Sequence, residues 1–339
     1  MNMLYAVVAF AIALLLTRTL CRPGTRWHIL DYPNERSLHT HPTPRTGGLA
    51  ILAAIYGAGA SAALTWPPTL TLAAIAAGGL AIATISFLDD RMGVPPARRM
   101  LVHVGAAIVL VAGGLGLPGV SLPGIHIGWS SLIGMPLTVL FVVWMVNLYN
   151  FMDGMDGLAG GMTAIGFTSF ALFGMSAGHA PFAVISLSIA AAAAGFLVFN
   201  FPPARIFMGD VGSSLLGILA AALALWGERD GIVPLWAALL IFSPFIVDAS
   251  VTLLRRAWRG EKVWQAHKRH YYQRLVQLGW GHKKTVLWEY ALMLACAGSA
   301  LWAAQQTPPA QWFILAFWAL CYPTLMLGVT RIERTRQSI

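Results

Sequence analysis

Charged residues are scarce in this sequence. Asp, Glu, Lys and Arg make up 10% of its 339 residues and hydrophobic residues 58%, whereas a typical soluble domain carries ~25% charged residues. Cysteine is scarce as well. Cys21, Cys296 and Cys321 lie in or beside apolar segments, are odd in number and lack metal-ligand spacing, so we expect neither a disulfide framework nor a thiolate metal site. The shortage of charge excludes a soluble multidomain protein and predicts a chain embedded in a membrane.

The hydrophobic residues gather in eleven segments, each close to the length that a helix needs to cross a bilayer. They lie near 3–20, 48–66, 70–88, 100–117, 131–149, 160–177, 181–199, 212–226, 233–254, 286–305 and 310–328. The first segment resembles a signal peptide in length. Arg18 and Arg22 follow its apolar run and no basic residue precedes it, so we expect a helix that is retained.

The distribution of basic residues predicts the orientation of the chain. Threading eleven helices through a bilayer places the loops at about 21–47, 89–99, 150–159, 200–211, 255–285 and 329–339 on one side. All but one of the 22 Lys and Arg residues lie on that side or at its edge, the exception being Arg229. Because basic residues accumulate in cytoplasmic loops, we expect an all-α polytopic membrane protein with about 11 transmembrane helices, a periplasmic N-terminus and a cytoplasmic C-terminus.

The net charge of +9 has a simple explanation in this topology. Basic loops on the cytoplasmic side face the anionic headgroups of the lipid bilayer. We therefore expect the bilayer as a partner and no nucleic acid.

Four polar side chains occur at the cytoplasmic end of the segment near 131–149. Asn147, Asn150, Asp153 and Asp156 recur at every third position, so neighbours are expected about one helical turn apart. Two carboxylates at this spacing repel each other unless a cation, a donor or a proton intervenes. The alternative is a solvated helix end with capping residues, but four such groups at a membrane boundary are costly and usually mark function.

Two more acidic motifs occur at helix ends on the same side. Asp210 lies in the run Phe207-Met-Gly-Asp-Val-Gly-Ser, after a Pro-Pro turn, and opens an apolar helix. It is either an N-cap or part of an anion site built on free backbone N–H groups. Asp89 and Asp90 close another apolar helix. They suggest metal chelation or a base with a raised pKa, with ordinary helix-end polarity as the alternative.

Two basic segments complete the set. The segment 31–48 combines Arg45 with rigid Pro and permissive Gly residues, and either surrounds phosphates or merely connects two helices. His267 and His270 are expected on one helix face, with Arg269 between them. A zinc site needs more ligands than this segment supplies, so we expect contacts to an anion, or else a basic amphipathic helix on the membrane surface.

All five motifs fall on one membrane face, and together they resemble the polyprenyl-phosphate N-acetylhexosamine-1-phosphate transferase family (glycosyltransferase family 4). The resemblance covers about 31–282 and is most specific in Asn150-x-x-Asp153-Gly-x-Asp156-Gly and Phe-Met-Gly-Asp210-x-Gly-Ser. It implies one transmembrane catalytic domain over residues 1–339, in the bacterial inner (cytoplasmic) membrane with a cytoplasmic active site. The implied reaction joins UDP-N-acetylhexosamine (UDP-HexNAc) and undecaprenyl phosphate to give undecaprenyl-diphospho-HexNAc and UMP, with Mg²⁺ as cofactor and Mn²⁺ as a substitute.

The resemblance also implies roles for individual residues. Asp210 is the expected main Mg²⁺ ligand and Asn150 a second one. The implied catalytic residues are Asp89 and Asp90, at the lipid phosphate, and Asp153 and Asp156, at the nucleotide and sugar. The implied substrate contacts are Asn147, Asn150, Asn200, Phe207, Arg45, His267, Arg269 and His270, with Asn200 and Phe207 around uracil and the histidines and Arg269 at the diphosphate.

Two departures from the family pattern bear on the substrate. The branch that uses a muramyl-pentapeptide carries consecutive His residues where this chain has Lys268 and Arg269 before His270. The early Pro-Asn-Glu-Arg-Ser-Leu-His and the late His-Tyr-Tyr-Gln-Arg-Leu look more like the branch that initiates O-antigen synthesis. Ser37 stands where Lys is common, which leaves the phosphate contact of this loop open.

Two other function classes were weighed. A secondary transporter places ionisable groups near the bilayer midplane, and here only Asp248 is a candidate, ~10 Å below the cytoplasmic boundary by helix rise. A structural scaffold leaves the Asp and Asn motifs unexplained. Three questions stay open. They are which sugar the donor carries, whether the lipid phosphate attacks directly or through an aspartyl-phosphate intermediate, and whether the protein is a monomer or a homodimer.

Overall fold

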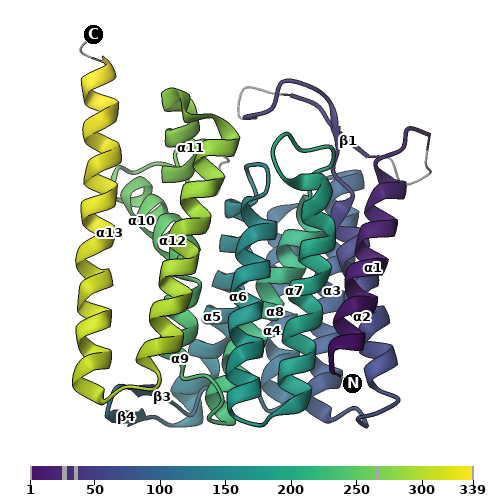
Figure 1. The fold of residues 1–339 in the computed structure, drawn as a ribbon, viewed down its shortest axis with the longest axis vertical. Coiled ribbons are helices and arrows are strands. Elements are labelled where there is room, and N and C mark those ends of the chain that lie inside the picture. The colour runs from purple at the N-terminus through teal and green to yellow at the C-terminus, as the bar shows by residue number, and fades with distance from the viewer. Residues whose placement is uncertain (1, 25–28, 34–36, 264–266, 338–339) are drawn as a thin grey trace.

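The computed structural model describes residues 2–24, 29–33, 37–263 and 267–337, and the protein is mainly helical (Figure 1). Its longer helices are α1 (Asn2–Leu20), α2 (Gly47–Ala62), α3 (Leu70–Met92), α4 (Pro96–Ala112), α5 (Ser131–Met152), α6 (Leu158–Ser176), α7 (Ala180–Asn200), α8 (Gly209–Arg229), α10 (Ser243–Trp258), α12 (Gly281–Ala303) and α13 (Pro308–Gln337). Two short helices, α9 (Leu235–Ile241) and α11 (Tyr271–Leu275), and a π-helical turn, η1 (Val276–Trp280), complete the helical elements.

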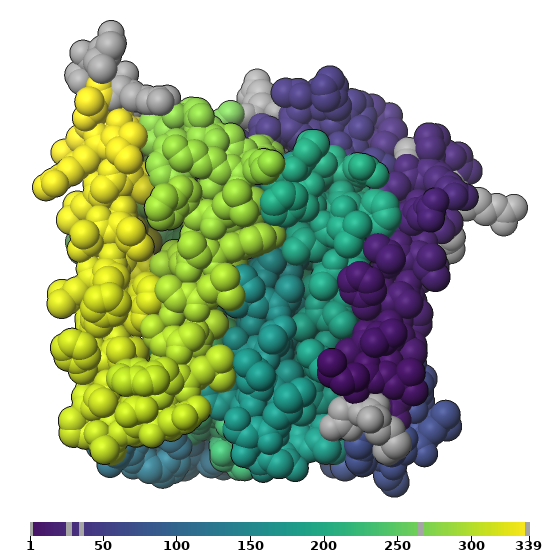
Figure 2. Space-filling model, in the orientation of Figure 1, coloured from purple at the N-terminus to yellow at the C-terminus, as the bar shows by residue number. Residues whose placement is uncertain are grey.

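The helices run side by side as one bundle, with the two chain ends at opposite ends of it (Figure 1). On the face that the space-filling view shows, α13, α12, α6, α7 and α1 follow one another from left to right (Figure 2). Within the described residues, eight helices are long and apolar enough to cross a membrane, or nine if a bent pair counts as one span. The protein is therefore a multi-pass membrane protein. Helices occur at all eleven predicted places, but α2 and α4 fall short as spans, so the count of eleven and the orientation of the termini stay predictions.

One predicted helix is not continuous. The segment 233–254 is divided into α9 and α10, whose axes differ by 79°. Pro244 lies in the first turn of α10, where the missing N–H costs no helical hydrogen bond, whereas a helix running through it would lose one. The break turns α10 toward the end of the bundle that carries the candidate site.

Four short strands were not expected from the sequence. β1 (Leu30–Asp31) pairs antiparallel with β2 (Thr43–Pro44), and β3 (Gly119–Leu122) with β4 (Ile125–Gly128). Both pairs lie in connections between helices, so the all-α architecture of the membrane part holds.

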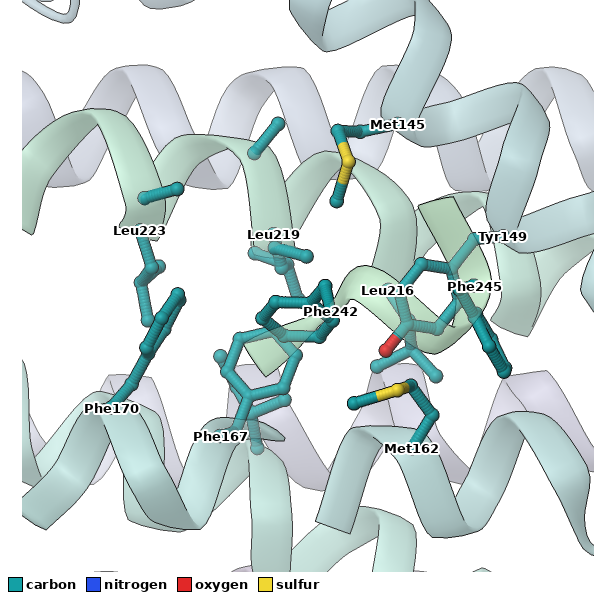
Figure 3. Packing of buried hydrophobic residues seen from close by; sticks show 14 of the residues in the cluster. Met145, Tyr149, Met162, Phe167, Phe170, Leu216, Leu219, Leu223, Phe242 and Phe245 are labelled. Carbon is teal, nitrogen blue, oxygen red and sulfur yellow. The ribbon is translucent and has the colours of Figure 1, made fainter. Parts of the chain in front are cut away.

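Helix α8 is the centre of the bundle. Every residue from Val211 to Gly227 is buried, and α8 packs against α2, α3 and α5. Aromatic and Met side chains of its neighbours, such as Tyr149 and Phe242, fill the space around it (Figure 3). Because α8 is held on all sides, the acidic residue in its first turn is fixed relative to the ends of α3 and α5.

Candidate active site

The site forms where the first turn of α2 crosses the first turn of α8. The N–H of Gly48 donates to the carbonyl of Met208 at 2.8 Å, and a Cβ on Gly48 would lie 2.2 Å from the α8 backbone. Gly209 has φ +71°, and a Cβ there would lie 2.2 Å from the carbonyl of Arg45. Only glycine accepts such contacts and this conformation. The close approach brings Arg45 beside Asp210.

A cavity of about 300 Å³ opens at this crossing. It is lined by Asp31, Ser37, Leu38, His39, Arg45, Asp90, Asn150, Asp153, Gly154, Met155, Asp156, Asn200, Phe207, Gly209, Asp210, Gln273 and His282. Eight of the residues that the resemblance singled out are among them: Arg45, Asp90, Asn150, Asp153, Asp156, Asn200, Phe207 and Asp210. Their elements are far apart in the sequence, so the fold gathers three of the acidic motifs and the early basic segment into one place.

A second hollow of about 420 Å³ adjoins the first. The two share the side chains of Leu38, His39, Asp156, Phe207 and His282. Binding sites for small molecules usually measure ~300–1,000 Å³, so the two hollows together have room for a ligand as large as a nucleotide sugar.

Two arginines lie against the acidic residues. Nη2 of Arg45 donates to the main-chain carbonyl of Asp90 at 2.6 Å, and its Nη1 is 3.5 Å from Oδ1 of the same residue. Nη1 of Arg99, on α4, forms an ion pair with Asp89 and lies 3.5 Å from Oδ2 of Asp210. The site therefore holds both signs of charge at short range.

The environment of Asp153 disfavours a negative charge on its carboxyl. Burial is the main cause that raises the pKa of the Asp153 carboxyl well above its usual range, and the carboxylates of Asp210 and Asp90 raise it further. Both effects disfavour the ionised form of this carboxyl unless a cation compensates for its charge. The site thus favours a divalent cation or a proton.

Asn150, Asp156 and Asn200 have defined partners. Nδ2 of Asn150 donates to Oγ of Ser213 on α8 at 3.2 Å. Oδ2 of Asp156 accepts from the N–H of Ala204 at 3.0 Å, while Oδ1 is 3.0 Å from Nδ1 of His282. The Asn200 amide accepts from the N–H of Gly157 and donates to the carbonyl of Ile206, both at 2.9 Å. These contacts tie the loops at 150–159 and 200–211 together beneath the cavity.

The three-residue spacing from Asn147 to Asp156 does not continue on a helix, as the sequence had suggested. Helix α5 ends at Met152, and Asp153 and Asp156 follow in a turn that leads to Gly157 at φ +77°. The turn points both carboxylates into the cavity, whereas Asn147 does not line it and donates to the carbonyl of Val143 in its own helix at 2.7 Å.

The basic segment near residue 270 is also placed differently from the expectation. His267 and His270 precede α11 and are not helical, although their rings lie 4.8 Å apart. Arg269 is exposed and pairs with Glu261. The cavity is lined by Gln273 of α11 and by none of these three side chains, so the prediction that they face a diphosphate stays untested.

Asp248 has a structural place. Its carboxylate accepts from the N–H groups of Tyr271 and Tyr272 at 3.0 and 3.2 Å, and Oδ1 lies 3.2 Å from Nδ1 of His270. Oδ1 also accepts from Thr252 at 3.0 Å. The acid that the transporter interpretation singled out therefore anchors α11 beside the site.

Sequence reasoning did not assign Arg99, Gln273 or His282 to the site. Arg99 stands ten residues after Asp89, within a predicted cytoplasmic loop, so a search for basic residues on the acidic face would have found it. The positions of Gln273 and His282 depend on how α11 and α12 pack, and no local pattern reveals that.

The residues present fit a magnesium ion. Among the described residues no three His, Cys, Asp or Glu side chains already form a complete metal site. Mg²⁺ does not need one, because it is usually bound by one or two carboxylates together with substrate phosphates and several waters. Asp210, with the Asn150 amide beside it and the repelling carboxylates of Asp90 and Asp153 nearby, offers such a partial set of oxygen ligands.

Comparison with known proteins identifies the family of the chain. Residues 72–228 match the model of the family "Glycosyl transferase family 4". The chain is 32% identical over 310 residues to a probable undecaprenyl-phosphate N-acetylglucosaminyl 1-phosphate transferase of Bacillus subtilis, covering 88% of this chain and 85% of the relative.

Two further relatives are similar over most of their length. A decaprenyl-phosphate N-acetylglucosaminephosphotransferase of Mycobacterium tuberculosis is 33% identical over 296 residues, 78% of this chain and 73% of the relative. A phospho-N-acetylmuramoyl-pentapeptide-transferase of Shouchella clausii is 28% identical over 277 residues, 76% of this chain and 82% of the relative. From this similarity, the chain belongs to glycosyl transferase family 4 and, within it, to the polyprenyl-phosphate N-acetylhexosamine-1-phosphate transferases.

Proposed function

We propose that this protein transfers HexNAc-1-phosphate from UDP-HexNAc to undecaprenyl phosphate and thereby initiates O-antigen or a related surface glycan. A phosphate oxygen of the lipid bonds to the phosphorus that carries the sugar, and the bond between that phosphorus and the bridging oxygen of UMP breaks. The products are undecaprenyl-diphospho-HexNAc and UMP. The site lies on the cytoplasmic side of the bacterial inner membrane in this proposal.

The observation that carries the proposal is the mixture of charges in one cavity at the end of a membrane bundle. Asp90, Asp153 and Asp210 line it, and Arg45 and Arg99 lie against these acids. Carboxylates in such a site hold a divalent cation, and guanidinium groups bind phosphate through paired hydrogen bonds. A diphosphate donor and a phosphate acceptor both require this combination.

Each side chain has a part in the proposed reaction. Asp210, with Asn150, holds Mg²⁺, and Mn²⁺ serves as a substitute. When bound there, the ion would supply positive charge toward the diphosphate and the departing UMP. Asp89 and Asp90, at the end of α3, orient the lipid phosphate, while Arg45 and Arg99 release part of their contact to the acids and bind phosphate oxygens.

The loops at 150–159 and 200–211 form the donor side of the site. Asp153 and Asp156 orient the nucleotide sugar, and Phe207 packs against uracil; its place in the lining of both hollows supports this role. Asn200 supports this wall through its bonds to Gly157 and Ile206 and shapes the uracil pocket from below.

The experiment is Mg²⁺-dependent release of UMP by detergent-purified protein, given undecaprenyl phosphate and a panel of UDP-N-acetylhexosamines. We expect release that requires the lipid and that EDTA abolishes, with the best donor identifying the glycan. The matched variant is Asp210→Asn, which removes one charge from a repelling cluster and should fold. Full activity of this variant, or no release with any donor from folded protein, would refute the proposal.

A further inference from the structure

A separate cavity of about 340 Å³ lies between the outer parts of α2, α3 and α7, at the end of the bundle opposite the site. Its walls include Ile75, Val184, Ile189 and Leu219, and small residues of α2 such as Gly59 complete them. None of the described residues that line it carries a charge. The cavity is therefore an apolar space within the membrane-spanning part of the protein.

The cavity follows from how α2 and α3 pack. Both helices lie against α8, and α8 supplies Leu219 as the back wall. Between the two helices the facing residues are small, such as Ala62 and Ala73, and the hydroxyl of Tyr56 donates across the gap to the carbonyl of Ala76. Side chains of this size leave the space between the helices unfilled.

The length of α2 adds to the gap. It has 16 residues, which span ~24 Å at the rise of an α-helix, less than the ~30 Å of the hydrocarbon core. The helix therefore ends within the hydrocarbon layer, and the non-helical residues 63–69 lead from it past Trp66 to α3.

Hydrocarbon suits this space better than water. An apolar cavity of ~150 Å³ stays dry and binds benzene, so a cavity more than twice as large accepts a longer hydrocarbon chain. Gly59, Ala60 and Ala73 line the cavity and are also exposed on the surface of the bundle. The cavity thus opens sideways, toward the place where bilayer lipids lie.

We propose that this cavity binds an acyl chain of a membrane phospholipid from the leaflet opposite the site. Trp66 at the rim is held by Tyr5, whose ring centroid is 5.8 Å away, and the Tyr5 hydroxyl bonds Thr65 at 2.6 Å. Tryptophan and tyrosine concentrate at the membrane interface. They mark the rim as the level of the headgroups, with the cavity below it at the depth of acyl chains.

The polyprenyl tail of the proposed substrate does not fit this place. Ala54, Ile82 and Leu215 lie on α2, α3 and α8 between the cavity and the site, and none of them is accessible to solvent. The interior between the two is closed, so a tail whose phosphate sits in the site has no internal path to the cavity. A bound acyl chain would instead support α8 through Leu219 and so help to fix Asp210 at the other end of that helix.

Filling the cavity with a side chain tests the proposal. Gly59 lines the cavity, and a Cβ on it meets no atom within 4 Å, so Gly59→Leu adds a large side chain at the cavity wall without a backbone clash. The matched control is Gly105→Leu on α4, where a Cβ also meets no atom within 4 Å and which does not line the cavity. Leu is a better helix former than Gly, so both variants should fold.

The measurement is native mass spectrometry of the detergent-washed full chain, together with mass identification of the extracted lipid. We expect about one phospholipid retained per chain in the wild type and in Gly105→Leu, and at least a five-fold loss of it in Gly59→Leu. Equal retention in Gly59→Leu would overturn the proposal, as would a wild type that retains none. If the retained lipid is a polyprenyl phosphate, the cavity binds the substrate and the proposal is overturned. If the chain forms a dimer that only Gly59→Leu dissociates, the cavity binds a second copy of the chain, which also overturns the proposal.

Discussion

The guanidinium of Arg99 bridges two carboxylates that lie far apart in the sequence. Its Nη1 pairs with Oδ2 of Asp89, at the end of α3, and lies 3.5 Å from Oδ2 of Asp210, at the start of α8. Side chains of Arg99 and Asp210 are each about one-third exposed, so water and ligands reach this contact. Arg99 supplies a positive charge at the place where the proposed function requires Mg²⁺ and a diphosphate.

Replacing Arg99 tests this arrangement. We expect Arg99→Gln to lower the rate of UMP release at least ~10-fold, because a hydrogen bond to a charged group contributes ~1.5–3 kcal/mol, and Arg99→Lys to lose less. With one cation removed from the acids, Mg²⁺ should stabilise Arg99→Gln at lower concentration than it stabilises the wild type. Thermal melting during an Mg²⁺ titration measures the second effect. The same titration curve in Arg99→Gln and the wild type would show that Arg99 does not influence Mg²⁺ binding.

The raised pKa of Asp153 predicts a pH dependence of stability. A carboxyl with a raised pKa in the folded state holds a proton that the unfolded state has released above pH ~4. Its contribution to stability is therefore full below that pH and is lost as the pH rises through the raised pKa. In EDTA we expect the melting temperature to fall with rising pH.

Two controls distinguish Asp153 from other groups. Asp153→Asn should flatten the slope of melting temperature against pH in EDTA, because the neutral amide has no proton to lose. Mg²⁺ should flatten it in the wild type, since a bound cation stabilises the ionised carboxylate. A slope that survives in Asp153→Asn would attribute the effect to another residue.

Asn147 and Asn150 should differ in their effect on activity, although the sequence treats them alike. The Asn147 amide bonds within its own helix, whereas Asn150 lines the cavity and bonds Ser213. The Asn150 amide also bonds the Asp210 carboxylate, and a hydrogen bond to a charged group contributes ~1.5–3 kcal/mol, so we expect Asn150→Ala to lose at least ~10-fold in activity. We expect Asn147→Ala to stay within about three-fold of the wild type. Steady-state UMP release measures both, and equal losses would contradict the placement of Asn147.

Asp248 should act on activity through α11. Asp248→Ala leaves the N–H groups of Tyr271 and Tyr272 and the His270 ring without their buried acceptor, at a cost of ~3–5 kcal/mol. We expect a lower melting temperature and a higher KM for the donor, because α11 carries Gln273 into the cavity.

The control for Asp248 uses another ion pair of α11. Arg274 pairs with Glu333 of α13; the side chain of Arg274 is 14% exposed and that of Glu333 is 35% exposed. Since solvent reaches the carboxylate, we expect a contribution near the ~0–1 kcal/mol of solvent-accessible pairs. Glu333→Gln should therefore change neither the melting temperature nor the KM appreciably. A loss of stability in Glu333→Gln as large as in Asp248→Ala would show that α11 tolerates no perturbation and that Asp248 has no special role.

The sequence alone determined the class of the protein, the places of the helices and most of the acidic residues of the site. Hydropathy is a property of each segment by itself, because every span must satisfy its own backbone and present apolar side chains to lipid. Once the apolar segments are known, threading them through a bilayer assigns the charged motifs between them to one membrane face. Asp90, Asp153 and Asp210 were identified on this basis, and the structure gathers them in one cavity.

Tertiary structure decided which side chains meet. The pairing of Arg99 with Asp89 and Asp210 depends on how α4 and α8 pack around α3, and the end of α5 at Met152 releases Asp153 and Asp156 from the helical spacing that the sequence suggested. Asn147, His267, Arg269 and His270 carry suitable chemistry, but the structure places them outside the cavity lining. Arg99 and Asp210 alone are 111 positions apart, and the geometry of such contacts follows from the packing of whole helices, which no local pattern of residues encodes.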